Sequence, residues 1–325
     1  MDRRRAMCSV LALAVGAEAD VLQAADPFPS KPVKIIVPFP AGSITDVYAR
    51  RTAHHLAPAL GQPVIVENRP GASGTIGVAL GAKAKPDGYT ITLATSSNLA
   101  IAPAVGMSLG FDPVHDLQPV TALVRTPMVL VVQPSLNVRK LAELVALAKA
   151  RPGQLAYASG GAANTPHIAA EVLRHVAGID LLHVPYNTGR ITAAMLGNEV
   201  QLGFDWPVTA IAHVRSGRFR ALLITGPRRV PLLPDVPTAS EAGYPELEIY
   251  GWAGYLVPKG TPRRIVVRLN TELVKALRST QIKAALEQEG GELGGDSPEA
   301  FAAFIRAEQA KFARIVQTTG IRLDQ

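Results

Sequence analysis

The stretch VPFPAGSITD, residues 37–46, connects an apolar run to an amphipathic segment through a loop that has small side chains and no cation. The apolar run, Val33–Val37, predicts a buried strand, and Ser43 to Asp46 fits a capping box at the start of a helix. In that motif the Ser43 side chain caps the helix and the Asp46 side chain reaches back to the Ser43 amide. Taken alone, the pattern favours a helix start with no further role. A helix N-terminus also carries unpaired N–H donors and about half a positive charge, so the loop could instead bind an anion.

A second stretch, YASGGAANTPHIAAEVL (residues 157–173), also leads from a predicted strand into a predicted helix, and its loop has no Lys or Arg. Gly160 and Gly161 let a ligand approach the backbone closely. The pattern predicts Thr165 as the N-cap and Pro166 in the first helical position. Two such helix starts, one on each of two lobes, could hold one small anion between them.

Short β-rich runs alternate with helical patterns along the chain, which is typical of parallel α/β sheets. The predicted strands are Val33–Val37, Val64–Glu67, Thr90–Thr95, Leu130–Gln133, Leu155–Ser159, Leu181–Val184, Gln201–Asp205 and Ala221–Thr225. The C-terminal third contains two long helical patterns, Arg263–Glu289 and Pro298–Thr318. Two apolar, extended segments, Pro119–Gln133 and Glu248–Val257, suit paired strands that cross between two lobes.

The expected domains are a signal peptide and two lobes, one inserted in the other. Residues 26–122 and 252–325 are expected to form lobe 1, and residues 123–251 lobe 2. Near the N-terminus, Asp2 to Arg5 resembles the charged region of an export signal, Cys8–Ala17 its apolar core, and Ala17 to Ala19 a cleavage site. We expect a signal peptide over 1–19, with 25 as an alternative end, and a periplasmic mature protein. No apolar run is long enough to span a bilayer.

The net charge and the composition limit which classes of partner the protein is expected to bind. The formal net charge is +7, aromatic residues make up 5% of the chain, and the basic residues are scattered. Stacking on bases needs aromatic side chains, so these values argue against a nucleic-acid partner and for a basic surface that mildly attracts anions. Cys8 is the single cysteine and lies in the predicted signal peptide, so we expect neither disulfides nor thiol chemistry in the mature protein.

Polar side chains follow three more predicted strands at their carboxyl ends, where open α/β sheets bind ligands. These are Ser96 in TSSN (95–98), Tyr186 and Arg190 in VPYNTGR (184–190), and Asp205 in FDWP (204–207).

Several long motifs together resemble one known family. They are PFPSKPVKIIVPFPAGSITDVYARRTAHHLAPALGQPVIVENRPGASGTIG, KPDGYTITLATSSNLAIAP, YASGGAANTPHIAAEVL, HVPYNTG, FRALLITGPRRVPLLPDVPTASEAGYP and VPKGTP. On these residues the chain, from 27 to 325, is similar to the Bug/TctC family, the extracytoplasmic solute receptors of tripartite tricarboxylate transporters.

The resemblance implies a type II periplasmic binding protein fold and a small carboxylate ligand, such as a di- or tricarboxylate, an amino acid or an aromatic acid. It also implies that backbone amides of two loops hold one carboxylate, partly through ordered water. Carried over, that role falls on Phe39, Ala41, Gly42, Ser43, Ser159, Gly160, Gly161, Asn164 and Thr165. Asp46, His167, Tyr186 and Asp205 also match family positions.

The sequence departs from the family pattern in both loops. Ala41 and Ser43 stand where the family has a proline and a glycine, and Asn187 to Ile191 replaces a Lys-Gly stretch. Among the new residues, Arg190 could face the cleft and select a ligand with a second acidic group, because guanidinium suits bidentate carboxylate binding. The alternative is a surface arginine on a loop.

Other functions fit the sequence less well. A hydrolase of the α/β class would need a G-x-S-x-G elbow, and neither Ser73 nor Ser159 has that frame. His167 and Glu171 are four residues apart on a predicted helix, but no further His, Asp or Glu cluster suggests a metal site, so no metal or cofactor is expected. GASGTIG (71–77) is interpreted as a turn rather than a nucleotide site. We therefore predict a monomeric solute receptor. It either delivers its ligand to permease subunits or presents it to a sensor protein.

Overall fold

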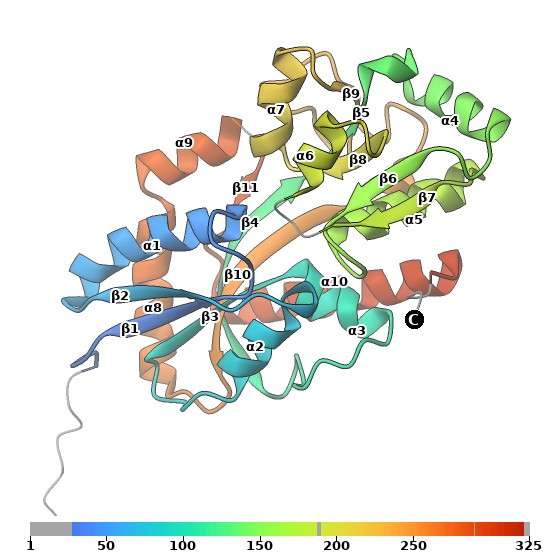
Figure 1. The fold of residues 1–325 in the computed structure, drawn as a ribbon. Coiled ribbons are helices and arrows are strands. Elements are labelled where there is room, and N and C mark those ends of the chain that lie inside the picture. The colour runs from blue at the N-terminus through green and yellow to red at the C-terminus, as the bar shows by residue number, and fades with distance from the viewer. Residues whose placement is uncertain (1–27, 187–189, 289, 322–325) are drawn as a thin grey trace, which may run out of the picture.

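A computed structural model of the protein describes residues 28–186, 190–288 and 290–321, and these residues form two α/β lobes, each built on one sheet (Figure 1). The sheet of lobe 1 has the order β11-β4-β10-β3-β1-β2. Its strands are β1 (Val33–Val37), β2 (Val64–Asn68), β3 (Thr90–Thr95), β4 (Leu117–Pro127), β10 (Tyr250–Pro258) and β11 (Glu292–Leu293). The predicted signal peptide lies outside the described residues.

The sheet of lobe 2 has the order β7-β6-β8-β5-β9. Its strands are β5 (Val129–Val132), β6 (Ala156–Ser159), β7 (Leu182–Pro185), β8 (Leu202–Asp205) and β9 (Arg220–Ile224). The helices of lobe 2 are α4 (Leu141–Ala150), α5 (Thr165–Ala177), α6 (Ile191–Leu196) and α7 (Pro207–Arg215). Those of lobe 1 are α1 (Ile44–Leu60), α2 (Thr75–Ala82), α3 (Ala102–Ala104), α8 (Arg263–Leu277), α9 (Thr280–Gln288) and α10 (Pro298–Thr319). Short turns of other helix types are η1 (Ala72–Gly74), η2 (Ser97–Ile101), η3 (Pro134–Leu136) and η5 (Pro245–Leu247).

Parallel pairing brings loops from different parts of the chain together. β1 pairs in parallel with β2, so that Val37 lies opposite Asn68 and the loops after these two strands are neighbours. In lobe 2, β6 pairs in parallel with β7, so that Ser159 lies opposite Pro185. The carboxyl ends of the strands therefore carry the loops that the sequence marked as candidate binding loops.

The alternation of strands and helices in the sequence predicted parallel sheets. Both sheets are instead mixed, with parallel and antiparallel strands. β10 is antiparallel to β3 and β4, and β5 is antiparallel to β8 and β9. The reason lies in the two crossings between the lobes. The chain leaves lobe 1 along β4 and returns to it along β10, so these two strands run in opposite directions and pair side by side (Figure 1). The predicted lobe boundaries, after residue 122 and after residue 251, fall inside these two crossing strands and stay predictions.

The hydrophobic core continues from one lobe into the other. On one face of the lobe 1 sheet, α1 and α8 bury an apolar core that includes Leu56 and Leu269. A second core joins Leu99 and Phe301 of lobe 1 to Ile168 of lobe 2, where α10 packs near α5. The lobes therefore share buried apolar surface behind the loops, on the side of the crossing strands.

The prediction of one helix over Arg263–Glu289 is wrong in one respect, because this segment forms two helices. α8 ends at Leu277 and α9 begins at Thr280. Ser279 accepts the amide of Lys283 through its carbonyl, so it occupies the capping position between the helices, which is where serine is favoured. Glu289 lies outside the described residues.

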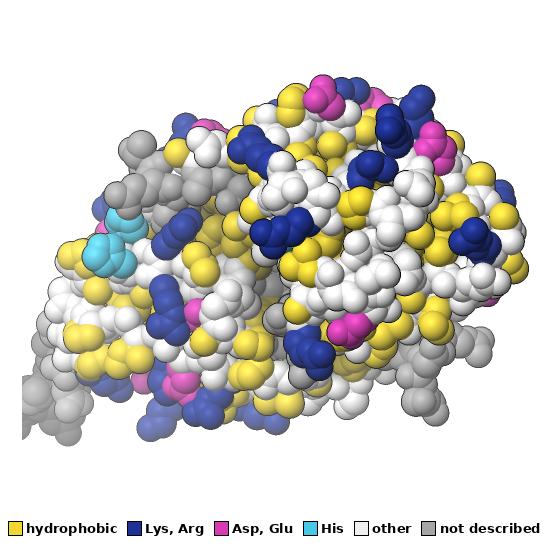
Figure 2. Space-filling model, turned by 45° about the horizontal axis from the view of Figure 1, so that its top comes forward, with side chains coloured by type: hydrophobic (Ala, Val, Ile, Leu, Met, Phe, Trp, Pro, Cys, Tyr) yellow, Lys and Arg dark blue, Asp and Glu magenta, His cyan; other side chains and the backbone are white. Residues whose placement is uncertain are grey.

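The described part of the chain contains no helix that is both long and apolar enough to cross a membrane. On the face drawn in Figure 2, Lys and Arg side chains are spread over both lobes with Asp and Glu among them, rather than gathered into one patch.

A packing contact at the crossing strands gives a first testable prediction. A Cβ atom on Gly251 of β10 would lie 2.1 Å from the Trp206 ring, so the glycine lets the indole pack against the backbone. We expect Gly251→Ala to lower the free energy of unfolding by about 1–3 kcal/mol through overpacking. Thermal unfolding followed by circular dichroism measures this change. Gly203→Ala is the control, because its Cβ would meet no atom closer than 3.4 Å. Equal Tm values for the two variants would contradict the prediction.

Candidate functional site

The loop before α1 forms the predicted cap, with one difference in the partner of Asp46. The Ser43 hydroxyl accepts the Asp46 amide at 3.3 Å, as a capping serine does. The Asp46 carboxylate, however, accepts the amide of Gly42 at 2.9 Å instead of the Ser43 amide, which donates to the Pro40 carbonyl. The reciprocal bond of the capping box is thus displaced by one residue, because the turn at Pro40 already uses the Ser43 N–H.

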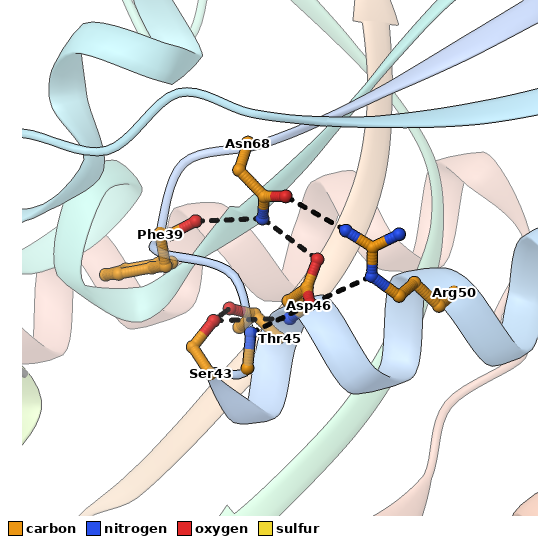
Figure 3. Close-up of polar contacts among 7 residues, drawn as sticks. Phe39, Ser43, Thr45, Asp46, Arg50 and Asn68 are labelled. Carbon is orange, nitrogen blue, oxygen red and sulfur yellow. Dashed lines mark hydrogen bonds and ion pairs between the residues drawn. The ribbon is translucent and has the colours of Figure 1, made fainter. Parts of the chain in front are cut away.

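Asp46 is the centre of a polar network at this loop (Figure 3). Its side chain accepts Asn68 Nδ2 at 2.9 Å and Arg50 Nε at 3.0 Å in addition to the Gly42 amide. Asn68 Nδ2 also donates to the Phe39 carbonyl, at 3.1 Å. The anion at the start of α1 is therefore the protein's own carboxylate. It uses the Gly42 amide, which the family resemblance had assigned to a ligand.

The Asp46 network predicts how stability depends on pH. Burial alone raises the pKa of Asp46, but hydrogen bonds from Arg50, Gly42 and Asn68 outweigh it and hold the pKa below its ordinary value. A carboxyl with a depressed pKa in the folded state stabilises the fold above its unfolded pKa of about 4, and this contribution is lost as pH falls through the folded pKa. We therefore expect Tm to decrease as the pH is lowered below about 4.

Asp46→Asn tests this expectation, because an amide cannot accept from all three donors. We expect it to lower the free energy of unfolding at pH 7 by about 1–3 kcal/mol and to flatten the decline of Tm in acid. Urea unfolding at pH 7 and thermal scans between pH 3 and 7 measure both effects. Asp87→Asn, which changes a more exposed carboxylate, should have little effect. An Asp46→Asn variant with the wild-type acid profile would argue against the network.

The loop before α5 begins its helix one residue earlier than predicted. Asn164, not Thr165, is the N-cap, and its side chain accepts the His167 amide at 2.9 Å. Thr165 and Pro166 take the first two helical positions. An asparagine cap is at least as favourable as a threonine cap, and here Asn164 has the extended backbone that a cap requires.

Ser159 shapes the turn between β6 and this helix. Its hydroxyl accepts the Gly161 amide at 3.2 Å and lies 2.7 Å from His183 Nε2. The His183 ring packs against both Tyr157 and His167, with ring centroids 4.9 and 4.4 Å away, and these two rings also stack on each other. Ser159 and His167 therefore support the loop from behind, and Gly161, with φ of 109°, makes the turn that only glycine adopts readily.

A cavity of about 660 Å³ opens between the loops of the two lobes. It is lined by Ala72, Ser73 and Met107 from lobe 1 and by Gly160, Gly161, Ala162, Pro185, Tyr186 and Arg190 from lobe 2. Among the described residues that line it, Arg190 carries the only formal charge. A cavity of this size and polarity suits a small anionic molecule.

Four of the predicted site residues line this cavity, namely Gly160, Gly161, Tyr186 and Arg190. The other predicted residues lie outside the lining of the described cavity; they are Phe39, Ala41, Gly42, Ser43, Asp46, Ser96, Ser159, Asn164, Thr165, His167 and Asp205. The Tyr186 hydroxyl donates to Glu199 at 3.0 Å, and the side chain is half-buried. Residues 187–189, where the sequence departs from the family pattern, lie outside the described residues.

Two predicted residues at strand ends support the fold near the cavity. Asp205 is buried, and its carboxylate accepts the Trp206 amide and the Thr209 hydroxyl at the start of α7. Burial raises the pKa of Asp205. Ser96 is also buried and bonds to the Thr165 hydroxyl of lobe 2 at 2.9 Å.

Sequence reasoning missed five of the lining residues: Met107, Ala162 and Pro185, and two residues of the loop of residues 71–74. In this loop Ala72 and Ser73 line the cavity, and both have left-handed backbones, with φ of 46° and 53°. Non-glycine residues rarely adopt this conformation, and it concentrates at functional sites. The sequence carried a usable signal, since GASG lies in the loop that follows the predicted strand Val64–Glu67, at the same sheet edge as the other candidate loops.

In the described residues, no group of three or more His, Cys, Asp or Glu side chains is arranged to hold a metal ion. The site is therefore built from loop backbones, one hydroxyl, one phenol and one guanidinium.

Two α/β lobes, paired crossing strands and a cavity between the lobes define the class of two-lobed periplasmic binding proteins. A family model described as the tripartite tricarboxylate transporter family receptor, TctC, matches residues 48–321, which is most of the chain. The chain belongs to the TctC family, and the resemblance seen in the sequence is confirmed.

Solved structures agree with this assignment. The chain is 32% identical to the periplasmic binding protein BugD, with a TM-score of 0.84 over 91% of this chain and 99% of that one. It is 33% identical to Rpa4515 of R. palustris, solved with adipate. The TM-score is 0.85, and the match covers 91% of this chain and 99% of that one. It is 30% identical to MatC from Rhodopseudomonas palustris, solved with bound malate. The TM-score is 0.83, and the match covers 89% of this chain and 100% of that one.

Proposed function

We propose that this protein is a periplasmic solute-binding protein that captures a small dicarboxylate between its lobes and delivers it to a membrane permease. The observation that carries the proposal is the cavity between the lobes, whose described lining has backbone loops from both lobes and a single charge, on Arg190. Membership of a receptor family, and the adipate and malate in two relatives of similar fold, support the same ligand class.

In the proposed complex, each lobe contributes to holding the ligand. One carboxylate binds at the amides of Gly160 and Ala162, near the positive end of α5, while Ala72 and Ser73 form the facing wall of the cavity in lobe 1. Arg190 binds the second carboxylate with its planar guanidinium. The apolar side chains of Met107 and Pro185 contact the carbon chain between the two acids.

The expected affinity follows from these contacts. Three or four charge-assisted hydrogen bonds, each worth about 1.5–3 kcal/mol, must offset the cost of ordering the ligand and closing the lobes. A binding free energy of about −8 kcal/mol, or micromolar affinity, is the result. Such an affinity suits a receptor that must also release its ligand.

The proposal includes export, the removal of residues 1–19 or of a segment ending near residue 25, and action as a monomer. The proposed partners are permease subunits. The proposal includes no nucleic-acid partner, and the scattered Lys and Arg side chains on the face drawn in Figure 2 support this part of it. The proposal includes no cofactor and no catalytic residue. A sensor protein that recognises the closed form is the alternative partner; deletion of the gene separates the two, because only a transport receptor is needed for uptake.

A ligand screen on protein purified from the periplasm tests the function. Succinate, malate and adipate should raise Tm, since a ligand at a hundred times its Kd stabilises the native state by about 2.7 kcal/mol. Acetate and glucose serve as negative controls, and calorimetry gives the Kd of each hit. If no carboxylate raises Tm, the function is wrong. Mass spectrometry of the same sample gives the cleavage site, and turnover of esters or amides would instead indicate a hydrolase.

A further inference from the structure

Direct hydrogen bonds join the two lobes at the cavity. The Ser73 hydroxyl, from the lobe 1 loop of residues 71–74, donates to the carbonyl of Ala162 in lobe 2 at 2.6 Å. Both residues line the cavity, so the bond crosses from one wall to the other. The hydroxyl belongs to a loop in which both Ala72 and Ser73 have left-handed backbones.

A second bond joins the lobes behind the cavity. Ser96, which follows β3 of lobe 1, lies 2.9 Å from the hydroxyl of Thr165, the first residue of α5. Both side chains are 1% exposed, so water does not compete for this bond while the lobes are together. The two lobe 2 partners, Ala162 and Thr165, are three residues apart on the loop that carries Gly160 and Gly161.

We propose that Ser73 and Ser96 form a latch that closes the lobes before any ligand is bound, and that Ser73 sets ligand affinity without contacting the ligand's charge. The second half of this proposal rests on the proposed function. Ser73 is a positioning residue: it fixes the carbonyl of Ala162, and with it the turn that carries the amides of Gly160 and Ala162, in the orientation that receives a carboxylate.

The latch acts on affinity through the population of the closed form. A ligand that is held only between closed lobes binds with an apparent Kd equal to its intrinsic Kd divided by the closed fraction. A bond that exists only in the closed form raises this fraction, tightens binding and slows release. Loss of one neutral hydrogen bond therefore weakens binding about two- to tenfold.

Three variants separate the hydroxyl from the backbone. Ser73→Ala removes the hydroxyl and keeps the Cβ atom, whereas Ser73→Gly removes the hydroxyl and also relieves the left-handed strain. Both should raise the Kd and the dissociation rate of adipate about two- to tenfold, measured by calorimetry and stopped-flow fluorescence. Ser216→Ala, at an exposed serine after α7, should leave both values unchanged. A Ser73→Gly variant that binds and releases adipate like wild type would overturn the proposal, because loop geometry alone would then matter.

A second measurement needs no ligand. Small-angle X-ray scattering of ligand-free wild type should give a radius of gyration that changes little when adipate is added. The double variant with Ser73→Ala and Ser96→Ala should be larger without ligand and should contract with adipate. If ligand-free wild type is as expanded as the double variant, the latch does not exist. If wild type binds no carboxylate, the proposed function fails, while the comparison of ligand-free proteins still decides the latch.

Discussion

Arg190→Ala is expected to weaken the binding of adipate about ten- to a hundredfold and to leave the affinity for hexanoate, a monocarboxylate of the same length, within about threefold. The reason is that Arg190 carries the only charge among the described residues lining the cavity, and a hydrogen bond between two charged groups contributes about 1.5–3 kcal/mol. Calorimetry with both acids on wild type and variant gives the two ratios.

Two further substitutions at arginine positions make the Arg190 experiment specific. Arg190→Lys keeps the charge but loses the planar pair of donors, so it should recover only part of the adipate affinity. Arg218→Ala removes an exposed arginine outside the cavity lining and controls for net charge. If Arg190→Ala weakens adipate and hexanoate equally, Arg190 does not select a second acidic group, and the interpretation of a surface arginine holds.

Gly161→Ala is expected to weaken dicarboxylate binding about tenfold or more with a modest effect on stability. Its φ of 109° is unfavourable for any residue with a Cβ atom, by about 1–3 kcal/mol, although a Cβ at this site would meet nothing within 4 Å. We expect the loop of the variant to relieve this strain by turning, which would move the amide of Ala162 away from the cavity.

A second glycine provides the matched control for Gly161→Ala. Gly178 ends α5 with φ of 60° and also has open space around its Cβ position. Gly178→Ala should therefore lower Tm by a similar amount and leave the Kd of adipate unchanged. Tm from circular dichroism and Kd from calorimetry, measured on both variants, distinguish strain at the ligand from strain elsewhere. Equal Kd values for the two variants would remove Gly161 from the binding site.

Local patterns predicted the elements well because their signals are short-range. β1 has the predicted bounds, because an apolar run marks its limits, and α1 begins directly after the predicted capping serine, Ser43. The crossing strands were also predicted, because two apolar, extended segments far apart in the sequence had few other partners. The break between α8 and α9 was missed, since the helical pattern continues through Ser279 and the competing cap is a local choice.

The site was predicted less completely than the fold. Its composition depends on which backbone and side-chain polar groups already form hydrogen bonds within the protein. Nothing in the order of residues shows that Gly42 donates to Asp46, or that Asn98 in TSSN turns inward to bond Thr95. The loop of residues 71–74 was dismissed as a turn, and only the parallel pairing of β1 with β2 places it at the cavity. Arg190 lines the cavity, and its role toward a ligand stays a prediction, whereas the loop of residues 39–43 lies outside the lining and bonds to Asp46 and Asn68.

The packing of Trp206 on Gly251 supplies the protein with an optical probe of its own. Trp206 and Trp252 are the two tryptophans of the chain, one beside the crossing strand β10 and one within it. Because β10 is one of the two strands that cross between the lobes, we expect a rotation of one lobe against the other to shift the first indole on this strand and alter its hydration. Emission from the unlabelled receptor should therefore follow ligand capture in real time, with no dye attached.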